Sequence, residues 1–206
     1  MTSATELLRS DILSGDFQPG KRLVELQLTE KYGVGRAAIR SAIVELSAEG
    51  LVVHEPNRGA TVQQVGVQTA IEIAQARAVL EGLLARYAAE RATDVQRAEL
   101  QAIATNMRSA VERSDQAEYS ELNRVLHRRV REVARHDVAS ELVGNLRNRG
   151  AQQEFQLSRV TGRSSVSLPQ HESIVQAIVD GDGDRAEAAM HAHLRSVEDA
   201  LRDWVA

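Results

Sequence analysis

Three of the six histidines fall on apolar faces of three separate helical segments. His127, His171 and His193 each recur with apolar residues at spacings of three and four, as side chains that face a helical core do. Imidazoles are ligands that zinc and nickel accept, and Asn123, one turn before His127, can add an amide oxygen. The pattern predicts a divalent metal site, possible ions being zinc or nickel. The alternative, three core histidines bonded to backbone carbonyls, stays open.

The other histidines do not share these faces. His191 is two residues before His193, which on a helix of 3.6 residues per turn is a rotation of about 200°, so we expect it on the polar side. His54 falls in a β-type run and His136 at a break between helices. The predicted metal site therefore includes none of the three.

A second group of residues can bind DNA. They lie in the predicted helix turn that begins at Gly35. Arg36 and Arg40 are four residues apart, so they share a helix face. The small residues Ala37 and Ala38 let a backbone approach closely. Arginine makes bidentate contacts to guanine or holds phosphates. No acidic residue falls between positions 31 and 40, so we expect a locally positive surface. The alternative, a solvated helix face, stays open on periodicity alone.

The elements that position Arg36 and Arg40 form a helix-turn-helix. Helices are predicted near 4–15, 24–32 and 36–48, and the glycine turn 33–35 separates the last two. Two β-type runs, 51–54 and 60–65, flank a turn cluster and predict a two-stranded wing. Arg58 and Gly59 lie at the tip of that wing, where arginine can reach the minor groove. Residues 1–66 are thus a predicted winged helix-turn-helix domain.

The rest of the chain predicts only helices. Segments near 67–91, 94–114, 116–135, 137–160, 168–180 and 183–204 are separated by polar or glycine-containing breaks. Residues 67–206 are therefore a predicted antiparallel bundle of about six helices. The fold class is mainly α, with a small β wing.

Composition narrows the class of protein. The 206 residues include no cysteine, which excludes disulfides, thiolate nucleophiles and cysteine zinc sites. No stretch approaches the roughly 20 apolar residues that span a bilayer, so we expect a cytoplasmic protein with no membrane contact. The net charge is −4, and residues 1–64 carry seven basic and eight acidic residues. DNA binding would therefore depend on locally placed charge.

The stretch from Leu8 to Val62 resembles the N-terminal domain of the GntR family of bacterial regulators. The matching pieces include Pro19-Gly20-Lys21-Arg22-Leu23, Gly33-Val34-Gly35-Arg36, Ile39-Arg40-Ser41-Ala42, Glu49-Gly50-Leu51-Val52 and Arg58-Gly59-Ala60. Both recognition-helix arginines are kept. Gly35, Ala37 and Ala38 replace the serine, threonine and proline typical of the family, so the resemblance implies the mode of DNA binding without implying the operator sequence.

Residues ~70–200 resemble the all-helical effector domain, named FCD, of the FadR-type branch of that family. The pieces that carry the resemblance are 77–81, 123–127, 171–178 and 190–194. Metal-binding members use an Asp-x-x-x-His motif plus two further histidines, and here Asn123 stands in place of the aspartate. The resemblance also implies an effector-binding role for Arg77. An ordinary i,i+4 salt bridge between Arg77 and Glu81 is an equal alternative.

These expectations combine into one leading function. We expect a homodimeric transcriptional repressor that binds a pseudo-palindromic operator and is released by a small carboxylate bound near the metal. One alternative is a regulator in which the metal ion is itself the effector. A metalloenzyme that uses the three histidines is a weaker alternative, because no general acid or base is identifiable beside them; we expect no enzymatic activity.

Overall fold

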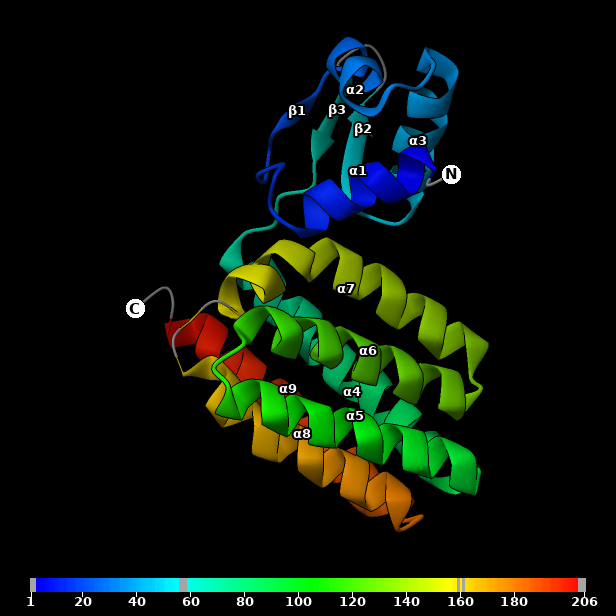
Figure 1. Cartoon of the computed structure of the whole chain (residues 1–206), viewed down its shortest axis with the longest axis vertical. Helices are drawn as coiled ribbons and strands as arrows, with labels where there is room; N and C mark the ends of the chain where they lie inside the picture. The colour runs from blue at the N-terminus through cyan, green and yellow to red at the C-terminus, as the bar shows by residue number, and fades with distance from the viewer. Residues whose placement is uncertain (1–2, 56–58, 159, 161, 204–206) are drawn as a thin grey trace. The chain divides into compact units, whose positions relative to one another are not determined.

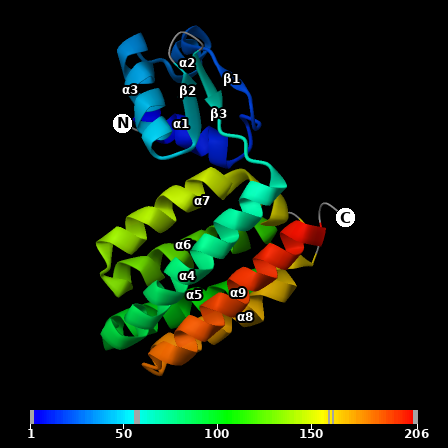
Figure 2. The same ribbon diagram turned by 180° about the vertical axis from the view of Figure 1, so that it is seen from behind.

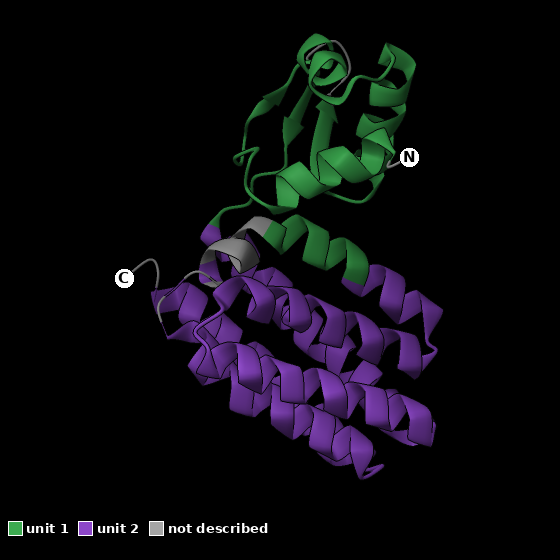
Figure 3. Ribbon diagram, in the orientation of Figure 1, with its two compact units in different colours: residues 1–66, 144–155 green, residues 67–143, 156–206 purple. Residues whose placement is uncertain are grey.

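The computed structural model describes residues 3–55, 59–158, 160 and 162–203 of the chain. It divides into two compact units (Figure 3). Unit 1 comprises residues 1–66 and 144–155, and unit 2 comprises residues 67–143 and 156–206. This division differs from the predicted ranges, 1–66 and 67–206, by grouping residues 144–155 with the N-terminal unit.

Unit 1 is built on a helix-turn-helix and a small sheet (Figure 1). Its elements are α1 (Ala4–Leu13), β1 (Arg22–Leu23), α2 (Glu25–Tyr32), α3 (Arg36–Ala48), β2 (Val52–Glu55) and β3 (Gly59–Val62). Leu8, Ile12, Ile39 and Leu46 are almost completely buried and join the helices in one apolar core. Burial of these side chains is the main stabilising contribution in so small a unit.

The sheet of unit 1 contains the predicted two-stranded wing, β2 and β3, and adds a third strand, β1, that the sequence analysis did not predict. The order is β1-β3-β2, all antiparallel, with Arg22 opposite Thr61 and Leu23 opposite Ala60. Strand β1 has only two residues, too few to show an alternating pattern. It pairs because Leu23 enters the core and β3 offers a free edge.

The turn between α2 and α3 depends on glycine. Gly33 ends α2 with a left-handed backbone (φ +65°), a conformation that glycine adopts without strain. Gly35 is the N-cap of α3 and supplies no side-chain hydrogen bond. Ile39 and Ile43 then fix the buried face of α3.

Unit 2 is helical throughout the part that the structure describes, which confirms the mainly α fold class. The helices are α4 (Val67–Arg91), α5 (Asp94–Glu112), α6 (Gln116–Ala134), the first part of α7 (Asp137–Ser158), α8 (Arg163–Val179) and α9 (Gly183–Asp203). Helices α4 and α9 run side by side along the bundle (Figure 2). Residues from all six helices meet in one apolar core. No described helix is long and apolar enough to cross a membrane.

Two details of unit 2 differ from the prediction. Helix α8 begins at Arg163, five residues earlier than expected, and carries Pro169 in its interior. Its first turns are held by Ser167, which is buried, accepts a hydrogen bond from Tyr119 of α6 and donates one to the Arg163 carbonyl within α8. His191 is not on an open polar face. It packs on Gly82, where a Cβ would lie 2.3 Å from its Nε2 atom.

Candidate metal centre and nucleic-acid interface

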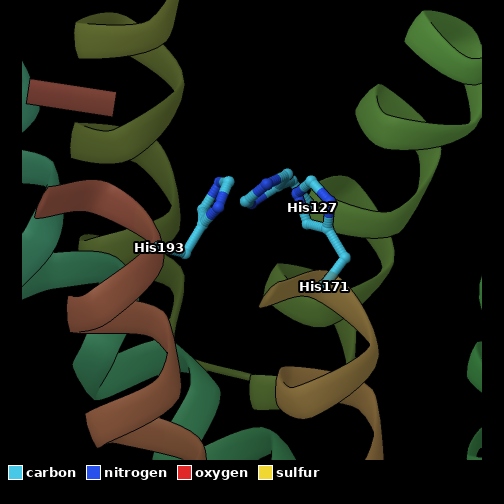
Figure 4. A group of neighbouring side chains, drawn as sticks. All are labelled: His127, His171 and His193. Atoms are coloured by element: carbon cyan, nitrogen blue, oxygen red, sulfur yellow. The ribbon is translucent and has the colours of Figure 1, made fainter. Parts of the chain in front are cut away.

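Helices α6, α8 and α9 bring His127, His171 and His193 together inside unit 2 (Figure 4). All three side chains are buried, and one ring nitrogen from each lies within 4.8 Å of the others. The ring centroids are 4.4 Å apart for His171 and His193, and 5.4 Å for the other two pairs. The structure thus places the three sequence-predicted histidines in one cluster.

Each histidine uses its Nδ1 atom for a hydrogen bond to a polar side chain. His127 Nδ1 lies 2.8 Å from Glu81 Oε2, and His193 Nδ1 lies 3.0 Å from Gln170 Oε1. Both oxygens can only accept, so both Nδ1 atoms carry the proton and donate. The Nε2 atom of each ring then keeps its lone pair, the form that binds a metal ion.

The tautomer of His171 follows from a chain of hydroxyl groups. Ser167 Oγ donates to the Arg163 carbonyl at 2.8 Å, and Tyr119 Oη donates to Ser167 Oγ at 3.0 Å. The single phenolic proton is therefore used, and Tyr119 Oη must accept from His171 Nδ1, 3.1 Å away. His171 thus presents a lone pair on Nε2 as well.

Electrostatics favour the neutral ligand form. Burial lowers the pKa of His193 well below its ordinary value, and the neighbouring His171 and His127 lower that pKa further. Glu81 acts in the opposite direction. His193 is therefore uncharged at neutral pH and does not have to lose a proton to bind an ion.

Asn123, the fourth predicted ligand, lies one turn before His127 on α6. Its Oδ1 atom is buried and has no hydrogen-bond partner within the described part of the chain. An unsatisfied buried carbonyl oxygen is costly in a folded protein unless something binds it. The three imidazoles and this oxygen fit the donor preferences of zinc or nickel.

Arg77, the predicted effector residue, is held in a buried ion pair. Its Nε atom lies 2.6 Å from Glu81 Oε1, and both side chains are at most 5% exposed. The same Glu81 carboxylate contacts His127 through its other oxygen. The structure thus contains the Arg77–Glu81 ion pair and links it to the histidine cluster through Glu81, while the effector-binding role of Arg77 stays a prediction.

The lowered pKa of His193 predicts how the stability of the metal-free protein depends on pH. Below about pH 6.5 this histidine is protonated in the unfolded chain but not in the folded chain. The free energy of unfolding is therefore highest above that pH and falls as the pH decreases. The expected slope is about 1.4 kcal/mol per pH unit. Urea unfolding between pH 7.5 and 5 measures this slope. His193→Gln should reduce the slope by about 1.4 kcal/mol per pH unit, which is the contribution of one proton. An unchanged slope would contradict the assignment.

On unit 1, the first turn of α3 forms an exposed surface that includes the predicted DNA-binding residues. Gly35, Arg36, Ala37 and Arg40 are all exposed, whereas Ile39 on the opposite face is fully buried. Arg36 forms no ion pair among the described residues. A base edge or phosphate can therefore approach this turn without disturbing the core of unit 1.

One acidic residue reduces the expected positive surface. Glu25, in the first turn of α2, accepts from Arg40 Nε at 2.9 and 3.1 Å. Lys31 does not replace the lost charge, because its Nζ atom pairs with Asp11 at 2.6 Å. The sequence interval between Lys31 and Arg40 contained no acid, but the fold brings one from another helix.

The Glu25–Arg40 pair leads to a prediction for Glu25→Gln. The pair is exposed, and removing the carboxylate takes a negative charge away from approaching phosphates. We expect about a three- to tenfold tighter binding to non-specific DNA at low salt, an effect that fades at high salt. Fluorescence anisotropy with a random duplex measures it. Weaker binding would show instead that Glu25 is needed to hold Arg40 in place.

Of the two predicted DNA-binding residues of the wing, the structure describes Gly59. Arg58 lies outside the described residues. Gly59 opens β3 with a left-handed backbone (φ +91°), which suits glycine at the end of a wing. The structure adds Arg22, which sequence patterns missed. Its guanidinium lies 3.8 Å from where a Cβ of Gly59 would be, because β1 pairs beside β3.

Comparisons with known proteins agree with both units. Residues 2–62 match the family model described as bacterial regulatory proteins, gntR family, and residues 72–196 match the FCD domain. The HTH-type transcriptional repressor RspR of Escherichia coli K12 is 27% identical over 95% of this chain and 86% of its own length. The Uxu operon regulator of Haemophilus influenzae is 29% identical over 96% of this chain and 80% of its own.

Among solved structures, E. coli McbR/YncC has the same fold. The TM-score is 0.85 at 20% sequence identity, and the match covers all of both chains. The two family models match the winged helix and the helical bundle in this order along the chain. The chain belongs to the GntR family of bacterial regulators, with a C-terminal FCD domain, and is a DNA-binding transcriptional regulator and not an enzyme.

Proposed function

We propose that this regulator is a homodimeric repressor whose DNA affinity is controlled by a small carboxylate bound near a metal ion in the FCD domain. The observation that carries the proposal is the convergence of three buried imidazoles in unit 2, each with its Nδ1 atom engaged by a neighbour. A purely structural core gains little from three neighbouring imidazoles, whose polar atoms must all be satisfied.

The ion would be held by His127, His171 and His193, with Asn123 as the candidate oxygen ligand. A bound zinc or nickel ion supplies a Lewis-acid site for a carboxylate oxygen. The protein's own part is to fix the ring orientations, through Glu81, Tyr119 and Gln170. Since Asn123 brings no negative charge, the ion keeps more of its positive charge for an anionic effector.

DNA binding follows the geometry of a helix-turn-helix dimer. The two copies of α3 would enter successive major grooves of a pseudo-palindromic operator in the cytoplasm. The effector must bind the DNA-free state more tightly than the DNA-bound state, because a ligand shifts an equilibrium only by that difference.

The test uses the full chain loaded with zinc, and DNA from upstream of its own gene. Operator affinity is measured by fluorescence anisotropy while acetate, lactate, succinate, citrate and sugar acids are added one at a time. We expect at least one to weaken binding about tenfold, and His171→Ala to abolish the response. An affinity that no carboxylate changes would overturn the proposal. Release by the ion alone would favour the metal-sensing alternative.

A further inference from the structure

Arg163, the first residue of α8, is a half-buried cation that no carboxylate of the described residues neutralises. Its Nη1 atom donates to Ser196 Oγ at 3.1 Å, and its Nη2 atom is buried without a hydrogen-bond partner among the described residues. No carboxylate within the described chain forms a salt bridge with it. An unpaired buried charge is strongly unfavourable, so proteins keep one where a ligand of opposite charge binds.

The position of Arg163 connects it to the histidine cluster. Arg163, Ser167 and His171 follow one another at spacings of four residues and therefore share one face of α8. Ser167 bonds Tyr119, which in turn bonds His171. Ser196, the partner of Arg163, lies one turn beyond His193 on α9. The guanidinium is also close enough to Tyr119, the partner of His171, to interact with it electrostatically.

The charges around Arg163 favour an anion there. Burial lowers the pKa of the guanidinium, and only the Tyr119 hydroxyl acts against that shift. No described carboxylate contributes a counter-charge to that shift. Arg77 differs in this respect, because Glu81 already neutralises it at 2.6 Å. Arg163 Nη2 has no hydrogen-bond partner among the described residues and can donate to an incoming carboxylate.

We propose that Arg163 is the residue that binds the effector's carboxylate, beside the metal-binding histidines, and that Arg77 only supports the cluster. Guanidinium and carboxylate form strong charge-assisted hydrogen bonds, which are stronger still away from water. The ligand class is a small organic acid. This inference rests on the proposed carboxylate response of the FCD domain.

The test compares the zinc-loaded full chain with Arg163→Met, Arg163→Lys and the control Arg108→Met. Arg108 pairs with Glu172, next to His171, but is exposed, so its loss removes a nearby charge without touching the buried region. Melting temperature is followed during titration with sodium acetate, lactate, succinate or phosphate at constant ionic strength, with chloride as reference. Stabilisation by the anion gives its apparent affinity.

We expect a carboxylate to stabilise the wild-type protein and Arg108→Met equally. Arg163→Met should weaken that binding about ten- to hundredfold, and Arg163→Lys by less. Without any anion, Arg163→Met should melt no lower than wild type, because an unpaired, half-buried charge has been removed. If Arg163→Met does not fold, Arg163→Lys carries the comparison.

Equal carboxylate affinity in wild type and Arg163→Met would overturn the inference. The inference would also be overturned if phosphate stabilised the protein and no carboxylate did. The same holds if no anion stabilised it more than chloride does. Operator affinity measured in the same samples separates the two proposals. If a carboxylate binds through Arg163 but leaves DNA affinity unchanged, the proposed function fails and the site stands. If a carboxylate still releases DNA from Arg163→Met, the assignment of Arg163 fails and the function stands.

Discussion

Replacing Arg36 and Arg40 together by alanine is expected to weaken operator binding at least about a hundredfold. Both side chains lie on the exposed face of α3, whose opposite face is anchored by buried Ile39 and Ile43. A good bidentate contact to a base contributes about 1–3 kcal/mol of discrimination. Since neither arginine supports the core, the double variant should fold normally.

The measurement is fluorescence anisotropy with operator DNA over a range of salt concentrations. A matched control is Arg113→Ala with Arg185→Ala, which removes the same two positive charges from exposed ion pairs of unit 2. We expect the control to bind like the wild-type protein. The α3 variant should also show a shallower salt dependence if either arginine holds a phosphate. Equal losses in both double variants would mean that net charge, and not α3, determines binding.

Removing one histidine of the cluster is expected to have the second large effect. His171→Ala should lower the affinity for zinc or nickel by more than about a hundredfold, since even the loss of a hydrogen-bonding support costs ten- to a hundredfold. Tyr119→Phe tests the loss of such a hydrogen-bonding support, because it leaves His171 Nδ1 without its acceptor. Calorimetric titration of the metal-stripped full chain measures both affinities.

His191→Asn is the matched control for the metal titration. His191 is on α9, two residues before His193, but packs on Gly82 and lies outside the histidine cluster. We expect it to keep one high-affinity ion per chain. If His171→Ala binds the ion as tightly as the wild-type protein, His127, His171 and His193 are core histidines and the metal proposal is wrong.

Much of the fold could be predicted because local signals agree with the tertiary structure. Glycine turns and polar breaks mark the helix ends, and apolar spacing placed His127, His171 and His193 on inward faces that the structure brings together. Periodicity could not show β1, which has two residues and exists only because β3 pairs with it. It also could not show that α8 continues through Pro169, since buried Ser167 holds the first turns.

The parts of the site that depend on contacts between helices were largely missed. Glu25 neutralises Arg40 from another helix, and Gln170 and Tyr119 orient histidines on helices α9 and α8. Arg163 looked like part of a loop, so its burial was not visible in the sequence. For Arg77 the sequence offered two interpretations, and the structure contains the 2.6 Å ion pair with Glu81 that one of them predicted.

The winged helix is expected to bind one operator sequence in preference to other DNA. The most direct measurement compares the wild-type full chain on DNA from upstream of its own gene and on a random duplex of equal length, at 150 mM salt, a condition of roughly 8 Å Debye length. We predict at least about a thousandfold preference for a pseudo-palindromic site within the upstream DNA. Equal affinity for both duplexes would contradict the account.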